Sequence, residues 1–407
     1  MNTTDQIDPK TIDVVQSTAE TSYVTRRGKE LLRRHQGSRA RRQKLAERLD
    51  EASQYQLMIV KFRKHRVATI SFFFLVLLYL AAVCAEFVAP YDPLQRFTDQ
   101  IYASPSVIRF TDTAGNLALP FIYDTKSQLD FATFSYRPEI VDTETQYRIR
   151  LFVPSEPYKL AGVIPMNIRL FGTAEGEPIF LFGADNLGRD VFSRIIYASR
   201  VSLFVGLAGV FISFVLGITL GGISGFFGGY IDTIIQRLVE FIMSIPQIPL
   251  WMALSAAIPQ EWTGIQTFFA ITVILSLVGW TGLARVVRGK IISLREEDYV
   301  TAAKISSASD RSIIFRHLLP GFTSYLIVHI TLAIPGMILG ETALSFLGLG
   351  INPPDISWGA LLQDAQDVTI VSTYPWLLVP CAFVMLAVIL YNFVGDGLRD
   401  AADPYTR

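Results

Sequence analysis

The side chains that most often carry out chemistry are few in this 407-residue sequence, and they do not gather into a reactive group. The four His residues are scattered, and neither an H-E-x-x-H nor a G-x-S-x-G pattern occurs. Cys84 and Cys381 both fall in apolar runs, which indicates neither a disulfide framework nor a metal cluster. The sequence also lacks G-x-x-x-x-G-K-[ST], the loop that cradles nucleotide phosphates. We therefore expect no catalytic residue, no metal ligand and no ATP site in this chain.

Two ionisable residues lie inside otherwise apolar runs and are the remaining candidates for a chemical role. They are His329 and Glu341. An ionisable side chain within a membrane span is energetically costly and by default suggests a function. For His329 we favour a neutral, hydrogen-bonded packing residue over a substrate ligand. Glu341 lies near the outer end of its run, and we expect it to reach water or a partner.

A polar segment, residues 298–320, lies between two long apolar runs and has the pattern of a short helix, a turn and a second helix. Ala302 and Ala303 are small, strong helix formers that would let a partner's surface come close. Pro320 marks the point where the chain turns into the next apolar run. The residues suited to the break and to the N-cap of the second helix are Ser306, Ser307, Ser309 and Asp310. Its apolar stripe consists of Ile313, Ile314, Leu318 and Leu319.

The composition is that of a polytopic membrane protein rather than an average soluble domain. Hydrophobic residues make up 51% of the sequence and charged residues 18%. A bilayer core of about 30 Å requires roughly 20 apolar residues in a helix. Six segments meet this requirement, near residues 67–89, 199–222, 232–258, 266–284, 322–343 and 375–396.

The uneven distribution of charge predicts how the chain is oriented in the membrane. Residues 26–66 contain fourteen Lys and Arg against four Asp and Glu, and residues 285–320 contain seven against four. By the positive-inside rule we expect both segments in the cytoplasm, and six spans bring the C-terminus back there. Basic residues before a span also suit anionic lipid headgroups, and we favour this role over a nucleic-acid patch. The first apolar run has full span length, so we expect no cleaved signal peptide.

The long segment between the first and second apolar runs has a strand pattern. Tyr147, Ile149, Leu151 and Val153 alternate with other residues, as in a strand with two different faces. The pieces LFVP, IRLFGT and IFLFGAD also look like short strands bounded by Pro and Gly. We therefore expect a small β-rich subdomain on the outer side of the membrane.

The second apolar run contains the clearest periodicity in the sequence. A small residue recurs every four positions, at Gly209, Ser213, Gly217, Gly221, Gly225 and Gly229. On a helix these residues form one nearly straight face about 30 Å long, on which another backbone can lie in close contact. We expect this helix to pack in the core of the bundle or against a second subunit. In the third run, Pro246 and Pro249 are expected to kink the helix.

Residues 183–203, just before the second run, contain both charges and apolar residues. Asp190 and Arg194 are separated by one helical turn, so we expect them to pair. The pattern predicts an amphipathic helix that lies at the outer surface. We expect four residues on the outer, partner-facing side: Asp185, Arg189, Asp190 and, further along the chain, Trp358.

Four separated stretches together resemble the permease subunits of binding-protein-dependent ABC importers, in the dipeptide, oligopeptide and nickel branch. The segment 298–320 resembles their EAA loop, E-A-A-x3-G-x9-I-x-L-P, with Thr301 in place of Glu and Ser307 in place of Gly. Without that Gly, we expect the turn to be made without a positive φ. The other three stretches are Gly183–Leu203, the segment around Trp358, and the C-terminal tail with Asp396, Leu398, Arg399, Asp400, Asp403 and Pro404.

This resemblance implies an all-α permease with six transmembrane helices and the β-rich insertion between the first two. It implies a homologous permease subunit, two ATPases that bind ATP and Mg, an extracytoplasmic substrate-binding protein, and residence in the bacterial inner membrane with both termini cytoplasmic. The residues it assigns to ATPase coupling are Asp298, Tyr299, Ala302, Ala303, Ser307, Asp310, Arg316 and Pro320. The insertion is then either a docking surface or lid for the binding protein, or a decoration that packs on the permease.

The expected organisation comprises five parts. They are a basic cytoplasmic tail with an interfacial helix (1–66), the first transmembrane helix (67–89), the periplasmic insertion with its amphipathic helix (90–198), a five-helix permease core that includes the coupling loop 285–321 (199–396), and a cytoplasmic tail (397–407). Peptides are the expected substrate, with oligosaccharides or nickel as alternatives for the same machinery. A membrane-embedded enzyme or a self-powered transporter is a further alternative, but the sequence offers no catalytic group for the former.

Overall fold

The computed structural model describes residues 54–111, 116–131, 135–173, 177–259 and 261–402. The basic tail before residue 54 lies outside this part of the chain, as do Asp403 and Pro404 of the C-terminal motif. Helix α2, Gln54–Lys64, falls within the predicted interfacial segment. From Phe62 onward the chain forms one compact unit, which is described below.

Most of this unit is helical, as predicted. Five helical segments are long and apolar enough to cross a membrane: α3 (Arg66–Val83), α5 (Val191–Phe227), α8 (Gly264–Leu294), the continuous segment Asp310–Phe346 that ends in α11 (Thr323–Phe346), and Pro375–Ala402, which contains α14 (Val379–Ala402). Helices α6 (Gly229–Ser244) and α7 (Gln247–Ser255) meet at an angle of 87° and make a sixth span if they are counted as one. The described chain therefore has five or six candidate spans.

The bend between α6 and α7 lies where the prolines predict it. Helix α6 ends at Ser244, and Pro246 is the N-cap of α7. Proline has no N–H to donate and its ring clashes with the preceding turn, so the helix breaks here. Pro249 lies in the first turn of α7, where its missing N–H has little cost.

Helix α5 begins earlier than predicted and overturns one expectation. Residues 191–199 do not form a separate amphipathic helix at the surface, because α5 runs without a break from Val191 to Phe227. Val191, Ile195 and Ser199 are buried in this first part of the helix. The charged residues of the segment are enclosed as well, and their partners are described below.

Four antiparallel strands form a sheet in the order β1-β2-β3-β4, which confirms the predicted β-rich insertion. The strands are β1 (Arg109–Thr111), β2 (Leu117–Asp130), β3 (Ser135–Leu160) and β4 (Ile164–Thr173). The IFLFGAD piece, however, is not a strand. Ile179 and Phe180 are buried in irregular structure, where Phe180 packs with Ala103 and Ala184. Their apolar character reflects this burial rather than strand pairing.

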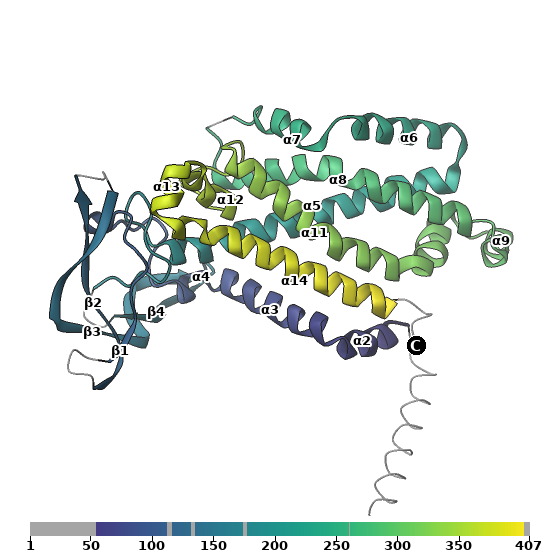
Figure 1. The fold of residues 1–407 in the computed structure, drawn as a ribbon. Helices are drawn as coiled ribbons and strands as arrows, with labels where there is room; N and C mark the ends of the chain where they lie inside the picture. The colour runs from purple at the N-terminus through teal and green to yellow at the C-terminus, as the bar shows by residue number, and fades with distance from the viewer. Residues whose placement is uncertain (1–53, 112–115, 132–134, 174–176, 260, 403–407) are drawn as a thin grey trace, which may run out of the picture. The chain divides into compact units, whose positions relative to one another are not determined.

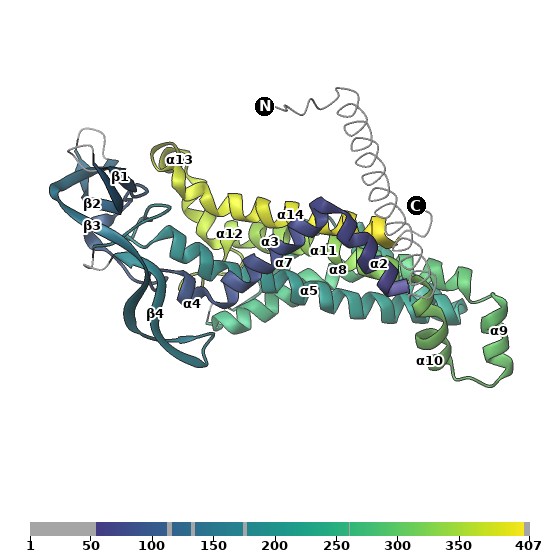
Figure 2. The same cartoon turned by 90° about the horizontal axis from the view of Figure 1, so that it is seen from below.

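The sheet lies at one end of the helices, and the short helices α9 (Asp298–Ile305) and α10 (Asp310–Ser312) lie at the other (Figures 1 and 2). We call these ends the sheet end and the loop end. Helix α4, Ala85–Val88, follows α3 at the sheet end and contacts β3 and β4. Helices α12 (Trp358–Leu361) and α13 (Val368–Thr373) also lie at this end.

Helices α5 and α8 form the most extensive helix pair in the described chain. Gly209, Ser213, Gly217, Gly221 and Gly225 are all buried on α5. A Cβ atom added at Gly217 would lie 2.9 Å from Leu283, and one added at Gly225 would lie 2.8 Å from the carbonyl oxygen of Arg288. Because these contacts leave no room for a side chain, the small residues set how closely the two helices approach.

Gly229 does not belong to this face, although the four-residue spacing included it. Helix α5 ends at Phe227, and both Gly228 and Gly229 have positive φ angles, +64° and +57°. The chain reverses here into α6, so Gly229 is exposed and no atom of the described chain lies within 4 Å of its missing side chain. A turn that needs left-handed backbone explains this glycine better than helix packing does.

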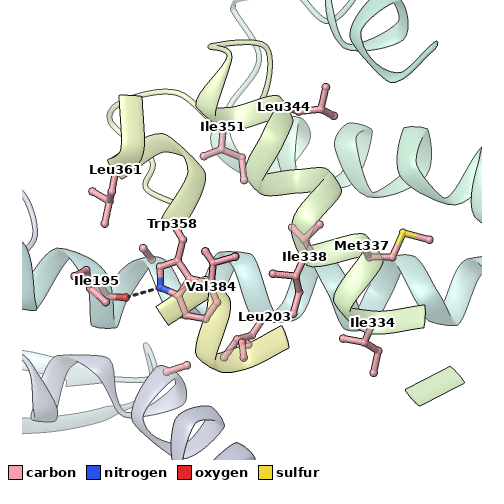
Figure 3. Packing of buried hydrophobic residues seen from close by; sticks show 14 of the residues in the cluster. Ile195, Leu203, Ile334, Met337, Ile338, Leu344, Ile351, Trp358, Leu361 and Val384 are labelled. Carbon is pink, nitrogen blue, oxygen red and sulfur yellow. Dashed lines mark hydrogen bonds between the residues drawn. The ribbon is translucent and has the colours of Figure 1, made fainter. Parts of the chain in front are cut away.

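The main hydrophobic core joins α3, α5, α11 and α14 around Trp358 at the sheet end. Figure 3 shows the indole of Trp358 among Ile195, Leu203 and Val384, with Ile338 of α11 nearby. A second core lies at the loop end. It contains Leu283, Val287, Ile291, Val300, Ala303, Ile313, Ile314, Leu318, Phe322 and Leu326.

Candidate functional site

The segment 298–320 has the predicted order of a helix, a turn and a second helix. Helix α9 ends at Ile305, and α10 continues into a π-helical segment, Ile313–Leu318, and a 3-10 segment, Leu319–Phe322. Ser309 is the N-cap of α10, since its hydroxyl accepts from the Ser312 N–H. Pro320 lies in the first turn of the 3-10 segment and does not interrupt the path into α11.

One side of this loop is fixed to the helical bundle. Val300 and Ala303 of α9 are buried in the second core, which also contains Val287 and Ile291 of α8. Ile313, Ile314 and Leu318 of the predicted apolar stripe are buried in the same core. The ammonium group of Lys304 lies 5.7 Å from the ring centre of Phe226, near the end of α5. The loop is therefore attached to α5, α8 and α11 by packing, and not only by its covalent ends.

The opposite side of the loop is exposed. It presents most of the residues singled out from the sequence: Asp298, Tyr299, Ala302, Ser307, Asp310, Arg316 and Pro320. Ala303 is the exception, because it faces the core. Ala302 is the alanine of the pair that a partner can reach. Side-chain contact through Ala303 would require the loop to come off the bundle.

Two exposed apolar residues were not singled out from the sequence. Ile305 is 80% exposed and Phe315 is 60% exposed. Together with Tyr299, also exposed, they give the polar loop apolar contact points. The sequence contained one signal of an exposed apolar residue here. Ile305 stands alone just before the serine-rich break, in the last turn of α9, and it does not share the buried side of that helix with Val300 and Ala303.

The turn after α9 contradicts the expectation that it needs no positive φ. Ser307 has φ +59°. The Ser307 N–H donates to the carbonyl oxygen of Lys304, and the Ala308 N–H donates to that of Ala303. The bond from Ala308 to Ala303 spans five residues instead of the four of an α-helix. A residue with left-handed backbone followed by such a bond is typical of a helix C-terminal cap, which usually contains Gly. Ser307 therefore adopts, at a steric cost, the conformation that Gly adopts freely.

Ionic contacts connect the helix ends close to the loop. The Asp232 carboxylate accepts from Arg288 Nε at 2.5 Å and from Nη2 at 2.6 Å. The same carboxylate accepts from the Ser224 hydroxyl at 2.5 Å, and Arg295 Nη1 donates to the Gly225 carbonyl oxygen at 3.1 Å. These bonds join the end of α5, the start of α6 and the last turns of α8.

At the sheet end, Asp185 is the centre of a buried ion cluster. Its carboxylate accepts from Arg189 Nε at 2.7 Å and from the Arg194 guanidinium, and both arginines are also buried. The expected pair of Asp190 with Arg194 is therefore wrong. Asp190 is instead the N-cap of α5, accepting from the Ser193 N–H at 2.8 Å. Its position immediately before the helix, where free N–H groups point outward, determines this role.

Burial raises the pKa of two carboxyl groups in this region. It raises the pKa of Asp190 to about 7, although the bond from Ser193 acts in the opposite direction. One carboxyl oxygen of Asp190 has no hydrogen-bond partner within the described residues, which leaves it free to carry a proton. Burial also raises the pKa of Asp364, with the nearby charge of Asp185 adding to the effect.

Glu341 and Trp358 are inside the protein, which corrects two expectations. Glu341 is completely buried and does not reach water. Its carboxylate accepts from the Ser202 hydroxyl at 2.9 Å and from the Ser345 hydroxyl at 2.7 Å. The indole N–H of Trp358 donates to the Ile195 carbonyl oxygen at 3.2 Å (Figure 3). The backbone N–H of Trp358 donates to the Ser202 hydroxyl oxygen at 3.1 Å. These bonds attach the first residue of α12 to α5, and they attach α5 to α11.

The outer-side assignment of Asp185, Arg189, Asp190 and Trp358 therefore needs revision. All four lie at the sheet end, but all four are buried. In the described chain they stabilise the junction between the loops and the helices and offer no exposed surface.

His329 is half-buried on α11 and lies beside Tyr325, with 6.2 Å between the ring centres. This placement agrees with a packing role. Within the residues that the structure describes, no three His, Cys, Asp or Glu side chains come together in a way that could hold a metal ion.

A cavity of about 760 Å³ lies at the sheet end, between the end of α7, the start of α8 and residues 348–355. Its polar lining includes Ser255, Thr263, Thr267, Asn352 and Asp355. Its volume is within the range of small-molecule sites. No sequence pattern predicted this cavity, because residues 348–355 lie far along the chain from residues 255–267, which form the rest of its lining.

The sequence matches two known families. Residues 217–407 match the family described as "Binding-protein-dependent transport system inner membrane component", and residues 53–105 match "N-terminal TM domain of oligopeptide transport permease C". The dipeptide transport system permease protein DppC of Bacillus subtilis is 41% identical over 227 residues, which cover 56% of this chain and 69% of that protein. The oligopeptide transport system permease protein OppC of Haemophilus influenzae is 41% identical over 232 residues, covering 57% of this chain and 72% of that protein.

Among solved structures, the chain is similar to one of the MetNI methionine ABC transporter in inward-facing conformations. The identity is 19%, the TM-score is 0.41, and the match covers 52% of this chain and 97% of that one. This similarity is too low to inform the assignment. The family matches and the two bacterial relatives are sufficient: this multi-pass chain belongs to the family of inner-membrane permease components of binding-protein-dependent ABC importers.

Proposed function

We propose that this chain forms, together with a homologous permease subunit, the membrane path for peptides, and that it couples this path to ATP hydrolysis by two separate ATPase subunits. In this proposal the chain contributes a path and a lever, and neither catalysis nor cofactor binding is assigned to it. ATP and Mg bind to the ATPases, and a periplasmic binding protein delivers the substrate. In this proposal the loop end and both termini are in the cytoplasm, and the sheet end is in the periplasm.

The observation that carries this proposal is the double character of the 298–320 loop. Its exposed side offers Ala302 and Ile305 to a partner, while Val300 and Ala303 on its other side are buried in a core that they share with Leu283, Val287 and Ile291 of α8. Helix α8 is in turn closely fitted to α5 through the glycine face. A displacement of α9 by an ATPase would therefore move α8 and α5 together, since packed interiors transmit displacement instead of absorbing it.

The proposed substrate class rests on the relatives. Permeases named for dipeptide and oligopeptide transport are 35–41% identical to this chain over 227–232 residues. The same machinery importing oligosaccharides or nickel is the alternative. Because substrate recognition in such a system is shared with the binding protein, uptake has to be measured with the whole assembly.

The coupling role is tested by a charge placed on the exposed side of α9. Ala302→Arg adds a long cation to the surface that meets the ATPase and should reduce ATP-dependent uptake and ATPase activity at least about tenfold, since a misplaced charge in an interface costs more than about 1.4 kcal/mol. Ala257→Arg is the matched control, because Ala257 is also an exposed alanine but lies beyond α7 at the other end.

Both variants should reach the membrane in normal amounts, because neither added side chain enters the core. Full uptake by the Ala302→Arg variant would contradict the coupling role of this surface. Equal loss of uptake in both variants would also contradict it, since the effect would then not depend on the loop.

A further inference from the structure

The hairpin formed by β3 and β4 extends from the sheet toward the helices. Arg169 Nη1 donates to the Ala89 carbonyl oxygen at 3.2 Å, and the ring of Phe152 lies 6.3 Å from that of Phe87. At the tip, the Ala161 N–H donates to the Glu86 carboxylate at 3.3 Å. The hairpin is therefore attached to α4 along much of its length (Figure 2).

The tip of the hairpin reaches the level of the membrane spans. Val83, Ala161, Arg200 and Phe204 together line a cavity of about 330 Å³. Val83 is the last residue of α3, and Phe204 lies 13 residues beyond the start of α5, which corresponds to roughly 20 Å along the helix axis. Ala161 thus lies beside helix surfaces that already belong to the apolar parts of two spans.

The side chains at the tip are apolar and uncovered. Val163 is 79% exposed and Ile164 is 55% exposed. One turn from the cavity, Leu80 on α3 and Leu207 on α5 are also exposed, as expected for helix faces in contact with lipid. The tip therefore extends an apolar surface that two spans begin, and it does not form an isolated patch.

The charges of the hairpin suit a negatively charged surface. Residues 148–173 contain four basic side chains and one acidic side chain. Lys159, Arg148 and Arg150 are exposed. Lys159 is the first residue of the tip, residues 159–164. Its long flexible side chain can place the ammonium group at the lipid headgroups while the neighbouring apolar side chains are buried.

We propose that the tip of the β3–β4 hairpin, residues 159–164, is inserted into the interfacial layer of the bilayer next to α3 and α5, and that it prefers anionic phospholipid. The insertion then acts as a second membrane contact that holds the sheet at a fixed height and angle above the path. This inference requires only that α3 and α5 span the membrane, and it does not depend on peptide transport or on ATPase coupling.

The test uses a polarity-sensitive fluorophore attached to the full-length chain in lipid nanodiscs. Val163→Cys is labelled in a background where Cys84 and Cys381 are replaced by Ala. Leu117→Cys is the control, because Leu117 is 89% exposed and begins β2 instead of lying near α4. Quenching by aqueous iodide should be about fivefold weaker at position 163 than at position 117, since interfacial segments lie about 5–10 Å inside the headgroup boundary.

Lipid composition and a second variant make the result specific. Nanodiscs that contain phosphatidylglycerol should protect position 163 more than nanodiscs of phosphatidylcholine alone, and Lys159→Glu should remove this difference. In nanodiscs, Val163→Asp should melt at a lower temperature than the unmodified chain, because a carboxylate is costly in an apolar surrounding, whereas Leu117→Asp should melt like the unmodified chain.

Equal iodide quenching at positions 163 and 117 in both lipids would overturn the proposal. Protection of position 163 that appears only after a binding protein is added would overturn it too, since the occupant of the surface would then be a protein.

Discussion

The close fit between α5 and α8 leads to a quantitative prediction for Gly221→Ala. A Cβ atom at Gly221 would lie 2.8 Å from the Cα of Ala284 and even closer to its carbonyl oxygen. Ordinary contacts of this kind are 3.4 Å or longer, so the backbones of the two helices must separate. Overpacking of a well-fitted core typically costs about 1–3 kcal/mol. We use the upper value because backbone, not a flexible side chain, has to move.

The change also has a favourable part, which must be subtracted. Alanine is better than glycine inside a helix by about 1 kcal/mol. The expected net loss of unfolding free energy is therefore about 2 kcal/mol, which corresponds to a decrease in melting temperature of about 3 °C for a chain of this size. The melting temperature can be followed by tryptophan fluorescence of the chain in detergent.

Gly282→Ala is the matched control for this experiment. Gly282 also lies inside α8, but within the described chain no atom is found within 4 Å of the Cβ that would be added. This variant should therefore melt at the unmodified temperature or slightly above it. If Gly221→Ala melted like Gly282→Ala, the two helices would not be as close as described, and the mechanical link between the loop and α5 would be refuted.

Three further variants test other parts of the structure. Ser307→Gly should raise the unfolding free energy by about 1 kcal/mol, because glycine adopts the left-handed conformation freely, and a lower melting temperature would contradict this account of the turn. Glu341→Ala should lower the unfolding free energy by about 3 kcal/mol, because the buried hydroxyls of Ser202 and Ser345 would lose the acceptor for their protons, and an unchanged melting temperature would argue against the buried cluster. For Asp190 the folded-state pKa of about 7 exceeds that of the unfolded chain, so the folded state holds its proton longer and stability falls as pH rises from about 4 to 7. Asp190→Asn should lack this decrease between about pH 4 and pH 7, and identical pH profiles for the two proteins would count against a protonated Asp190.

The parts of the fold that the sequence predicted are those determined by periodicity. Runs of apolar residues of span length predicted the membrane helices, and the four-residue spacing predicted the tight face of α5. The alternating pattern around Leu151 predicted the strands. These signals are local and repeated, so they survive without knowledge of tertiary structure.

The errors occurred where a tertiary contact decides the outcome. The i,i+4 spacing favoured a pair of Asp190 with Arg194, but Asp185 and the N-cap position determine the actual bonds. Glu341 lies near the end of its apolar run, yet it is buried. Its partner Ser202 is on α5, a helix that is far away in the sequence but adjacent in space. The sequence of the loop did not reveal that Ala302 is exposed and Ala303 is buried, because this depends on where α8 lies.

We propose that this permease works in an assembly whose ATPase subunits bind the 298–320 loop. The most direct measurement is mass spectrometry of the proteins that accompany the tagged chain when it is purified from its native membrane in mild detergent, together with an assay of ATP hydrolysis. We expect a second permease and ATPase subunits to accompany the unmodified chain, and the ATPases and their activity to be lost from the Ala302→Arg variant. A chain that purifies alone, hydrolyses no ATP and still carries solute across a membrane would contradict the account.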